Sequence, residues 1–145
     1  MSSAEVAVQV FRKLENEDFR VLQVTEAAMS RHEFVPKELI AKYADFSLEE
    51  TEFRLNRLQK MRLIRQIRGP YAGYTLNYAG YDCLAINTLV KAGVLEAFGK
   101  PLGVGKEADV YEALNPKRER IAIKFHRLGR ISFRQTKRKR GYTLK

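Results

Sequence analysis

A glycine-rich turn followed by a lysine-bearing strand is the feature that most constrains how this chain of 145 residues can fold. Gly103 and Gly105 lie in the segment GVGKEADVY (103–111), where the missing side chains let the backbone approach a ligand and leave its amides free to donate. The later run Ile-Ala-Ile-Lys ends at Lys124, whose ammonium suits phosphate oxygens. The arrangement predicts a hairpin over nucleotide phosphates, and the alternative is an ordinary tight turn without a ligand.

The spacing of this segment matches most of the nucleotide motif of protein kinases, which is G-x-G-x-x-G-x-V followed by a lysine in a later strand. Val110 occupies the position of the valine that covers the base, and Lys124 follows Gly103 by 21 residues. Ala108 stands where the motif has its third glycine. The strand context that such a motif requires is predicted over residues 98–104, 108–114 and 120–126.

The first 92 residues have the element order of a winged helix-turn-helix domain. Apolar periodicity and helix-start signals predict helices, then a two-stranded hairpin, then a further helix closed by Gly93. The fold class that we predict is α+β, with the winged-helix domain and linker helix over 1–92 and the first antiparallel strands of a kinase-like N-lobe over 93–145. The predicted helices are 6–14, 16–32, 36–43, 48–61 and 77–90, and the hairpin strands are 63–68 and 74–76.

The helix over 48–61 begins at a capping box, in which the Ser47 and Glu50 side chains satisfy backbone amides reciprocally. On a helical wheel its leucines lie on one side and its basic residues on the other, so a solvated face is one interpretation. The absence of any acid over the 16 residues 53–68 favours contact with a nucleic-acid backbone instead. The predicted contacts on the recognition helix and wing are Arg54, Arg57, Lys60, Arg65 and Arg68.

The net charge of +10 is concentrated at the C-terminal end of the chain. Residues 117–145 carry 12 Lys or Arg and one acid, whereas residues 1–116 sum to −1. We expect Ser132 to cap a basic helix over 133–140. This helix is either a solubilising element or an arm that faces RNA, and the size of the surplus favours RNA.

Several other functions are disfavoured. The single cysteine, Cys83, cannot form an internal disulfide and predicts a buried thiol in a reducing cytoplasm. His32 and His126 lack neighbours at metal-ligand spacing, so no metal site is predicted within the chain. Apolar runs end well before the roughly 20 residues of a membrane span, and the N-terminus has no signal-peptide pattern. We therefore expect a cytoplasmic protein without membrane association.

The segment GVGKEADVY resembles the phosphate loop of the RIO atypical serine/threonine protein kinases. The segment IKFHRLGR (123–130), with Ser-Phe-Arg after it at 132–134, resembles the lysine strand of the RIO kinase two subfamily in particular. That subfamily also carries an N-terminal winged helix, so the resemblance covers nearly the whole chain. It implies a kinase or ATPase in maturation of the small ribosomal subunit, with the precursor's ribosomal RNA as a partner and the protein substrate unknown.

The resemblance also assigns roles to residues. It implies that Val110 contacts adenine and that Lys124 binds the α and β phosphates of ATP. The catalytic loop and the Mg²⁺-binding aspartate of the family would follow Lys145, so we expect no catalytic residue here and no kinase activity from this polypeptide alone. The loop over the triphosphate would be formed by Gly103, Val104, Gly105, Lys106, Glu107 and Ala108.

A second hypothesis comes from another functional class. The chain would be a free-standing winged-helix nucleic-acid-binding protein without enzymatic activity, and its C-terminal strands would only stabilise it. The Gly-Lys-Glu loop with Lys124 separates the two hypotheses, because a transcription factor has no use for either feature.

Overall fold

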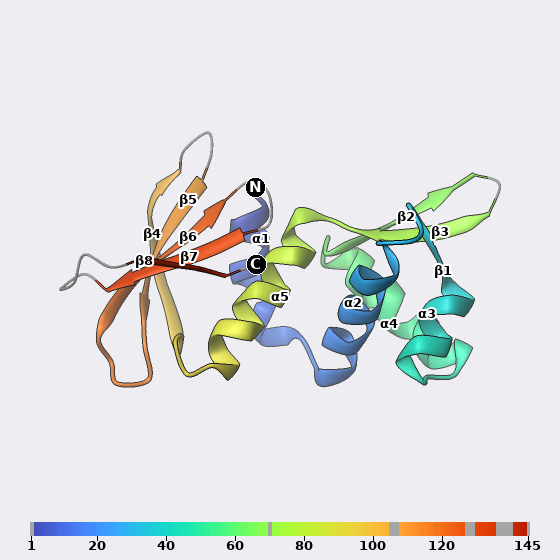
Figure 1. The fold of residues 1–145 in the computed structure, drawn as a ribbon, viewed down its shortest axis with the longest axis horizontal. Coiled ribbons are helices and arrows are strands. Elements are labelled where there is room, and N and C mark those ends of the chain that lie inside the picture. The colour runs from blue at the N-terminus through green and yellow to red at the C-terminus, as the bar shows by residue number, and fades with distance from the viewer. Residues whose placement is uncertain (1, 70, 105–107, 127–129, 136–140, 145) are drawn as a thin grey trace.

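Helices fill most of the N-terminal part of the chain in the computed structural model, which describes residues 2–69, 71–104, 108–126, 130–135 and 141–144 (Figure 1). Their apolar sides form the core, in which Leu22, Ile40, Leu55 and Leu58 are fully buried. None of the described helices is both long enough and apolar enough to cross a membrane. The elements are α1 (Ser3–Val10), the 3₁₀ turn η1 (Phe11–Lys13), α2 (Asn16–Ala28), α3 (Lys37–Ala44) and α4 (Leu48–Lys60).

A three-stranded antiparallel sheet completes the winged-helix domain. Strands β2 (Ile64–Arg68) and β3 (Ala72–Leu76) form the predicted wing, with Ile64 opposite Leu76. Strand β1 (Val35–Pro36) pairs with the other edge of β3, which gives the order β1-β3-β2. The sequence analysis did not predict β1, because two residues are too few to show an alternating pattern.

The capping box predicted at the start of α4 is only half formed. The Ser47 hydroxyl accepts a hydrogen bond from the Glu50 amide at 3.0 Å, as predicted. The Glu50 carboxylate instead accepts from Arg54 Nε at 2.5 Å, since a guanidinium is a stronger donor than a backbone amide. A complete box caps α2, where the Glu15 and Asp18 side chains and amides bond reciprocally.

Helix α5 (Tyr78–Lys91) connects the winged-helix domain to a second sheet (Figure 1). It lies beside α1, and the buried Cys83 thiol donates to the Ala7 carbonyl at 3.9 Å. The helix ends at Lys91 with Ala92 as its C-cap, and the next residue is Gly93, predicted to close the helix, whose φ of 74° is the left-handed conformation. Burial raises the pKa of the Cys83 thiol, which is consistent with an inert structural cysteine.

The C-terminal part forms a five-stranded antiparallel sheet in sequential order. Strands β4, β5 and β6 occur where they were predicted, but the helix predicted over 133–140 was wrong. Residues 130–135 pair with β6 as a strand, because the alternating run Ile131-Ser132-Phe133 suits the open edge of that sheet, and 136–140 lie outside the described residues. The strands are β4 (Ala97–Val104), β5 (Ala108–Leu114), β6 (Arg120–His126), β7 (Arg130–Gln135) and β8 (Gly141–Leu144).

Candidate nucleotide site and winged-helix surface

The five-stranded sheet aligns three of the predicted nucleotide-site residues in one row. Gly103 on β4 lies opposite Val110 on β5, and Val110 lies opposite Lys124 on β6. Residues directly opposite each other in antiparallel strands point to the same face of a sheet. Residues that the sequence separates by up to 21 positions therefore form a continuous strip across three strands.

The opposite face of the sheet is the buried one. Along β5 and β6 the residues alternate in burial, and Tyr111, Ile123 and Phe125 point into the core. The Tyr111 ring lies edge-on to Phe125 with the ring centres 5.7 Å apart, and Phe98 from β4 contacts both rings. This aromatic packing anchors the three strands and leaves the strip of Gly103, Val110 and Lys124 on the open face.

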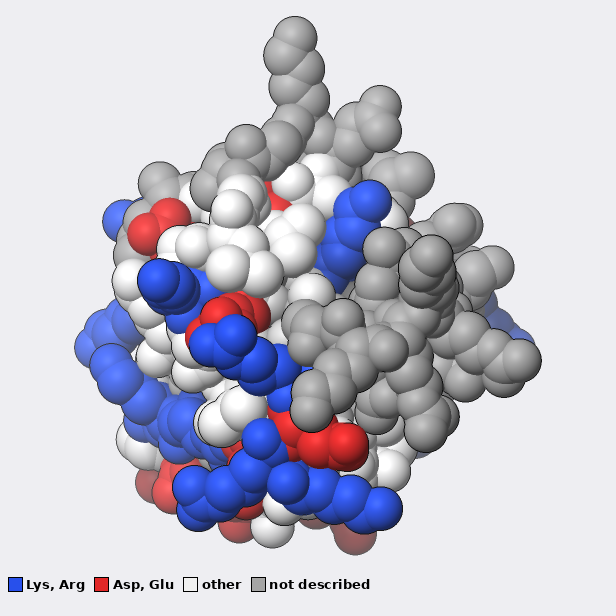
Figure 2. All heavy atoms as spheres, turned by 90° about the vertical axis from the view of Figure 1, so that its left-hand side faces the viewer, with Lys and Arg blue, Asp and Glu red and all other residues white. Residues whose placement is uncertain are grey.

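The open face leaves room above the strip. A side chain on Gly103 would meet no atom of the described residues within 4 Å, and Lys124 is exposed and forms no ion pair with any of them. Figure 2 views the molecule from the side of this sheet and shows basic side chains outnumbering acidic ones among the coloured residues. An anionic ligand would therefore meet a favourable charge on this side.

Two further predicted phosphate-loop residues, Val104 and Ala108, lie at the end of β4 and the start of β5, beside the strip. The Val104 backbone pairs with Asp109, and Ala108 begins β5 opposite His126. Gly105, Lys106 and Glu107 lie outside the described residues.

Ala122 lies on the open face two residues before Lys124, and it was not among the predicted nucleotide-site residues. Its register partner is Glu112, in the row next to Val110. The strand period of two could have identified it, because residues i and i+2 share a face.

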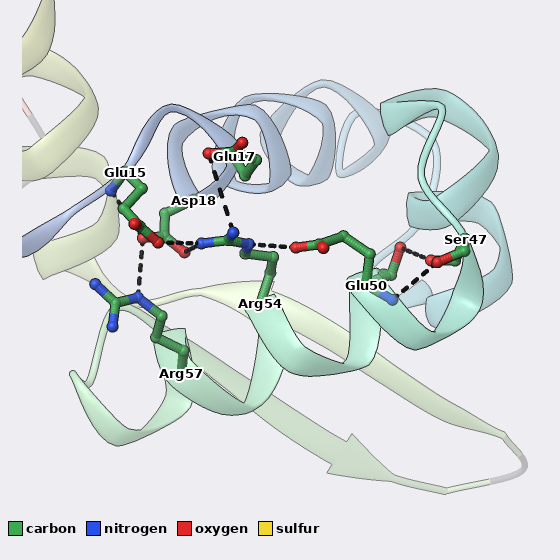
Figure 3. Close-up of polar contacts among 8 residues, drawn as sticks. Glu15, Glu17, Asp18, Ser47, Glu50, Arg54 and Arg57 are labelled. Atoms are coloured by element: carbon green, nitrogen blue, oxygen red, sulfur yellow. Dashed lines mark hydrogen bonds and ion pairs between the residues drawn. The ribbon is translucent and has the colours of Figure 1, made fainter.

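The winged-helix surface corrects the basic face predicted for α4. Arg54 is only 8% exposed and lies among acids from α2 and α4 (Figure 3). Its guanidinium contacts Glu15 at 2.6 Å, Glu50 at 2.5 Å and Asp18 at 3.3 Å. Burial acts to lower the pKa of Arg54, but these hydrogen bonds outweigh it and raise the pKa. Arg54 therefore joins α4 to α2 and is not available to phosphate.

Arg57 is partly engaged in the same cluster (Figure 3). Its Nε donates to Asp18 at 3.0 Å, and its terminal nitrogen donates to the Lys13 carbonyl. Asp18 is fully buried, and both of its carboxylate oxygens are neutralised, Oδ1 by Arg54 and Oδ2 by Arg57. The hydrogen bond from Arg54 lowers the pKa of Glu15. The predicted basic residues that remain exposed are Lys60, Arg65 and Arg68.

Comparison with known proteins agrees with this architecture. A family model described as "Rio2, N-terminal" matches residues 11–92, which is more than half of the chain. The chain belongs to the Rio2 family. This result confirms the resemblance to the winged-helix-bearing RIO kinases, and the fold class is confirmed with it.

Named relatives and a solved structure extend the similarity into the second sheet. The chain is 40% identical over 134 residues to "Serine/threonine-protein kinase rio2" of Dictyostelium discoideum, covering 92% of this chain and 26% of the relative. It is 44% identical over 114 residues to "RIO-type serine/threonine-protein kinase Rio2" of Methanocaldococcus jannaschii, covering 79% of this chain and 41% of the relative. The chain thus spans less than half the length of these relatives.

The solved structure is that of the Rio2 kinase from Chaetomium thermophilum in an ADP/Mg²⁺-phosphoaspartate complex. It superposes with a TM-score of 0.77 at 37% identity, covering 90% of this chain and 40% of that one. The kinase in that crystal is in complex with ADP and Mg²⁺, and this chain matches less than half of its length.

Proposed function

We propose that this chain is the N-terminal part of a RIO-type serine/threonine protein kinase or ATPase, and that ATP binds on the open face of its five-stranded sheet. The observation that carries this proposal is the strip of Gly103, Val110 and Lys124 across three strands. Val110 would contact adenine, and the exposed Lys124 ammonium would bind the α and β phosphates. Gly103, Val104, Gly105, Lys106, Glu107 and Ala108 would cover the triphosphate. The naming of the relatives as kinases supports this assignment.

The described residues do not fit a Mg²⁺ site by themselves. No group of three His, Cys, Asp or Glu side chains lies together in the part of the chain that the structure describes. Oxygen ligands from carboxylates are what this ion requires from a protein. We therefore propose no Mg²⁺ ligand among the described residues, and the part that the open face of the sheet would play is binding of the nucleotide.

Replacing Lys124 with alanine in the full-length protein is expected to weaken ATP binding about 10- to 100-fold, since hydrogen bonds to charged groups contribute about 1.5–3 kcal/mol. Isothermal titration of ATP measures the change. Lys117→Ala is the matched control, because it removes an exposed lysine from the turn between β5 and β6. Equal affinities of wild type and Lys124→Ala for ATP would refute the assignment of the open face as the nucleotide site.

We further propose that the winged helix contacts ribosomal RNA of a small-subunit precursor. The exposed bases Lys60, Arg65 and Arg68 would contact phosphates, since they lie at the end of α4 and on the wing. We do not assign this role to Arg54, which is buried among acids, or to Arg57, whose Nε is bonded to Asp18. We expect these residues to contact the phosphate backbone of duplex or single-stranded RNA, because the sequence identifies no side chain that would read the bases.

The combined variant Lys60→Ala, Arg65→Ala, Arg68→Ala is expected to reduce the slope of log affinity against log salt by about 2–3 for an RNA probe, since each phosphate contact contributes about 0.7–0.9. Filter binding of the small-subunit RNA at several salt concentrations gives the slope. Lys42→Ala with Arg31→Ala removes exposed bases elsewhere in the domain and serves as control. An unchanged slope in the triple variant would place the RNA contact on another surface.

A further inference from the structure

Phe53 lies on the outer stripe of helix α4, and the proposed function gives it no role. The outer stripe consists of four residues at helical spacing, all of them exposed: Glu49, Phe53, Asn56 and Lys60. Phe53 is the aromatic member and is 57% exposed. Single apolar residues are often exposed without a function, but the surroundings of this ring distinguish it.

The Phe53 ring lies against a guanidinium that several ion pairs hold in place. The central carbon of Arg54 lies over the ring, 5.1 Å from its centre, which is the geometry of a cation–π contact. Arg54 is in turn bound by Glu15, Asp18 and Glu50 (Figure 3). The ring is therefore backed on one side by a fixed cation and remains open to solvent elsewhere. A ring held in this way loses little side-chain freedom when a planar ligand stacks on it.

The charges along α4 determine which part of a nucleic acid can approach this ring. On the outer stripe, Glu49 lies about one turn before Phe53, and Lys60 lies about two turns after it. A phosphate beside the start of α4 would therefore be repelled, whereas a phosphate beside its end would be attracted. The adjacent Glu52 is neutralised by Lys37 at 2.7 Å. A base carries no charge and has an aromatic face, so it is the part of the polymer that suits Phe53.

The base that stacks on this ring must be unpaired. In duplex RNA the bases stack on one another, and the major groove is too deep and narrow for side chains to read. A duplex along the outer stripe would also bring phosphates close to Glu49. Single-stranded RNA presents bases that splay out onto aromatic side chains. Asn56, three residues after Phe53, adds an amide that can hydrogen-bond the edge of such a base.

We propose that the outer stripe of α4 binds single-stranded RNA, with one unpaired base stacked on the Phe53 ring, opposite Arg54 and beside Asn56. From this base the strand would continue toward Lys60, where the proposed phosphate contacts of the winged helix begin. The stacked base rests on the proposed contact of the winged helix with RNA, and it specifies the form of RNA that is bound. The guanidinium that joins α4 to α2 would then also support the ring that receives the base.

The test compares the full-length wild type with Phe53→Ala, using a single-stranded RNA oligonucleotide and the duplex that it forms with its complement. We expect Phe53→Ala to bind the single strand about 5- to 100-fold more weakly, the range for loss of one base–aromatic stack. Duplex affinity and the salt slope should stay unchanged, because stacking neutralises no phosphate. Tyr43→Ala is the matched control, since Tyr43 is an aromatic residue of α3 that is 51% exposed. Equal losses on both probes, or no loss on the single strand, would overturn the proposal.

A second measurement reads the stacked base directly, and it decides if Phe53→Ala does not fold. Phe53→Trp keeps an aromatic face and should retain the affinity for the single strand. Its added fluorescence, taken as the difference from the wild type, should be quenched by the single strand and not by the duplex. Quenching by neither probe at saturating RNA would overturn the stacked base and leave Phe53 to a protein partner.

The stacked base and the proposed phosphate contacts fail in different ways. If the Lys60, Arg65 and Arg68 triple variant loses salt slope while Phe53→Ala binds like the wild type, only the stacked base is refuted. If Phe53→Ala loses affinity for the single strand while the triple variant keeps its slope, only the phosphate contacts are refuted.

Discussion

Replacing Arg54 with alanine is expected to lower the free energy of unfolding of the chain by about 3–5 kcal/mol, the usual cost of removing one partner from a buried ion pair. Asp18 is fully buried, and its Oδ1 lies 3.3 Å from the Arg54 guanidinium. Without Arg54 this carboxylate would keep only Arg57 as a cationic partner. The same substitution would also remove the ion pair that joins Glu15 to α4 and the pair between Glu50 and Arg54 within α4.

Urea unfolding followed by circular dichroism measures the loss of stability. Lys60→Ala is the matched control on the same helix, since Lys60 is exposed, and it should change stability by less than about 0.5 kcal/mol. RNA affinity of both variants, measured under conditions where they remain folded, separates a structural role from a binding role. Unchanged stability of Arg54→Ala together with a loss of RNA affinity would restore Arg54 as the phosphate contact that the sequence analysis predicted.

The wrong placement of Arg54 shows where sequence reasoning fails. A helical wheel locates a residue relative to the apolar side of its own helix, and Arg54 lies at the border of that side, about 100° from Leu55 and about 40° from Leu58 on α4. Its partners Glu15 and Asp18 come from a helix more than 35 positions earlier. No local pattern reports such a contact, so a buried charge was interpreted as an exposed one.

The strands of the second sheet could be predicted where their own sequence pattern determines them. The spacing of the glycine motif predicted Gly103, Val110 and Lys124 as nucleotide-site residues, and the registers of β4, β5 and β6 place them in one row. The basic composition of residues 133–140 favoured a helix, although 130–135 pair with β6.

Replacing Gly80 with alanine is the second substitution for which we expect a large effect, a loss of about 3 kcal/mol in the free energy of unfolding. A Cβ atom at this position of α5 would lie 2.3 Å from the Leu63 carbonyl oxygen and 3.3 Å from the Leu76 side chain. Leu63 is fully buried before β2, and its carbonyl already accepts a hydrogen bond from the Asn77 amide at 3.0 Å. The clash is with backbone, so helix and wing must separate to relieve it.

Alanine would also favour the helix by about 1 kcal/mol, so the expected loss is what remains after this gain. Thermal and urea unfolding of Gly80→Ala measure the net change in the free energy of unfolding. Gly69→Ala in the wing is the control, because a side chain there meets no atom within 4 Å, and its stability should stay within about 0.5 kcal/mol of wild type. A Gly80→Ala variant as stable as the wild type would mean that α5 does not approach the Leu63 carbonyl this closely.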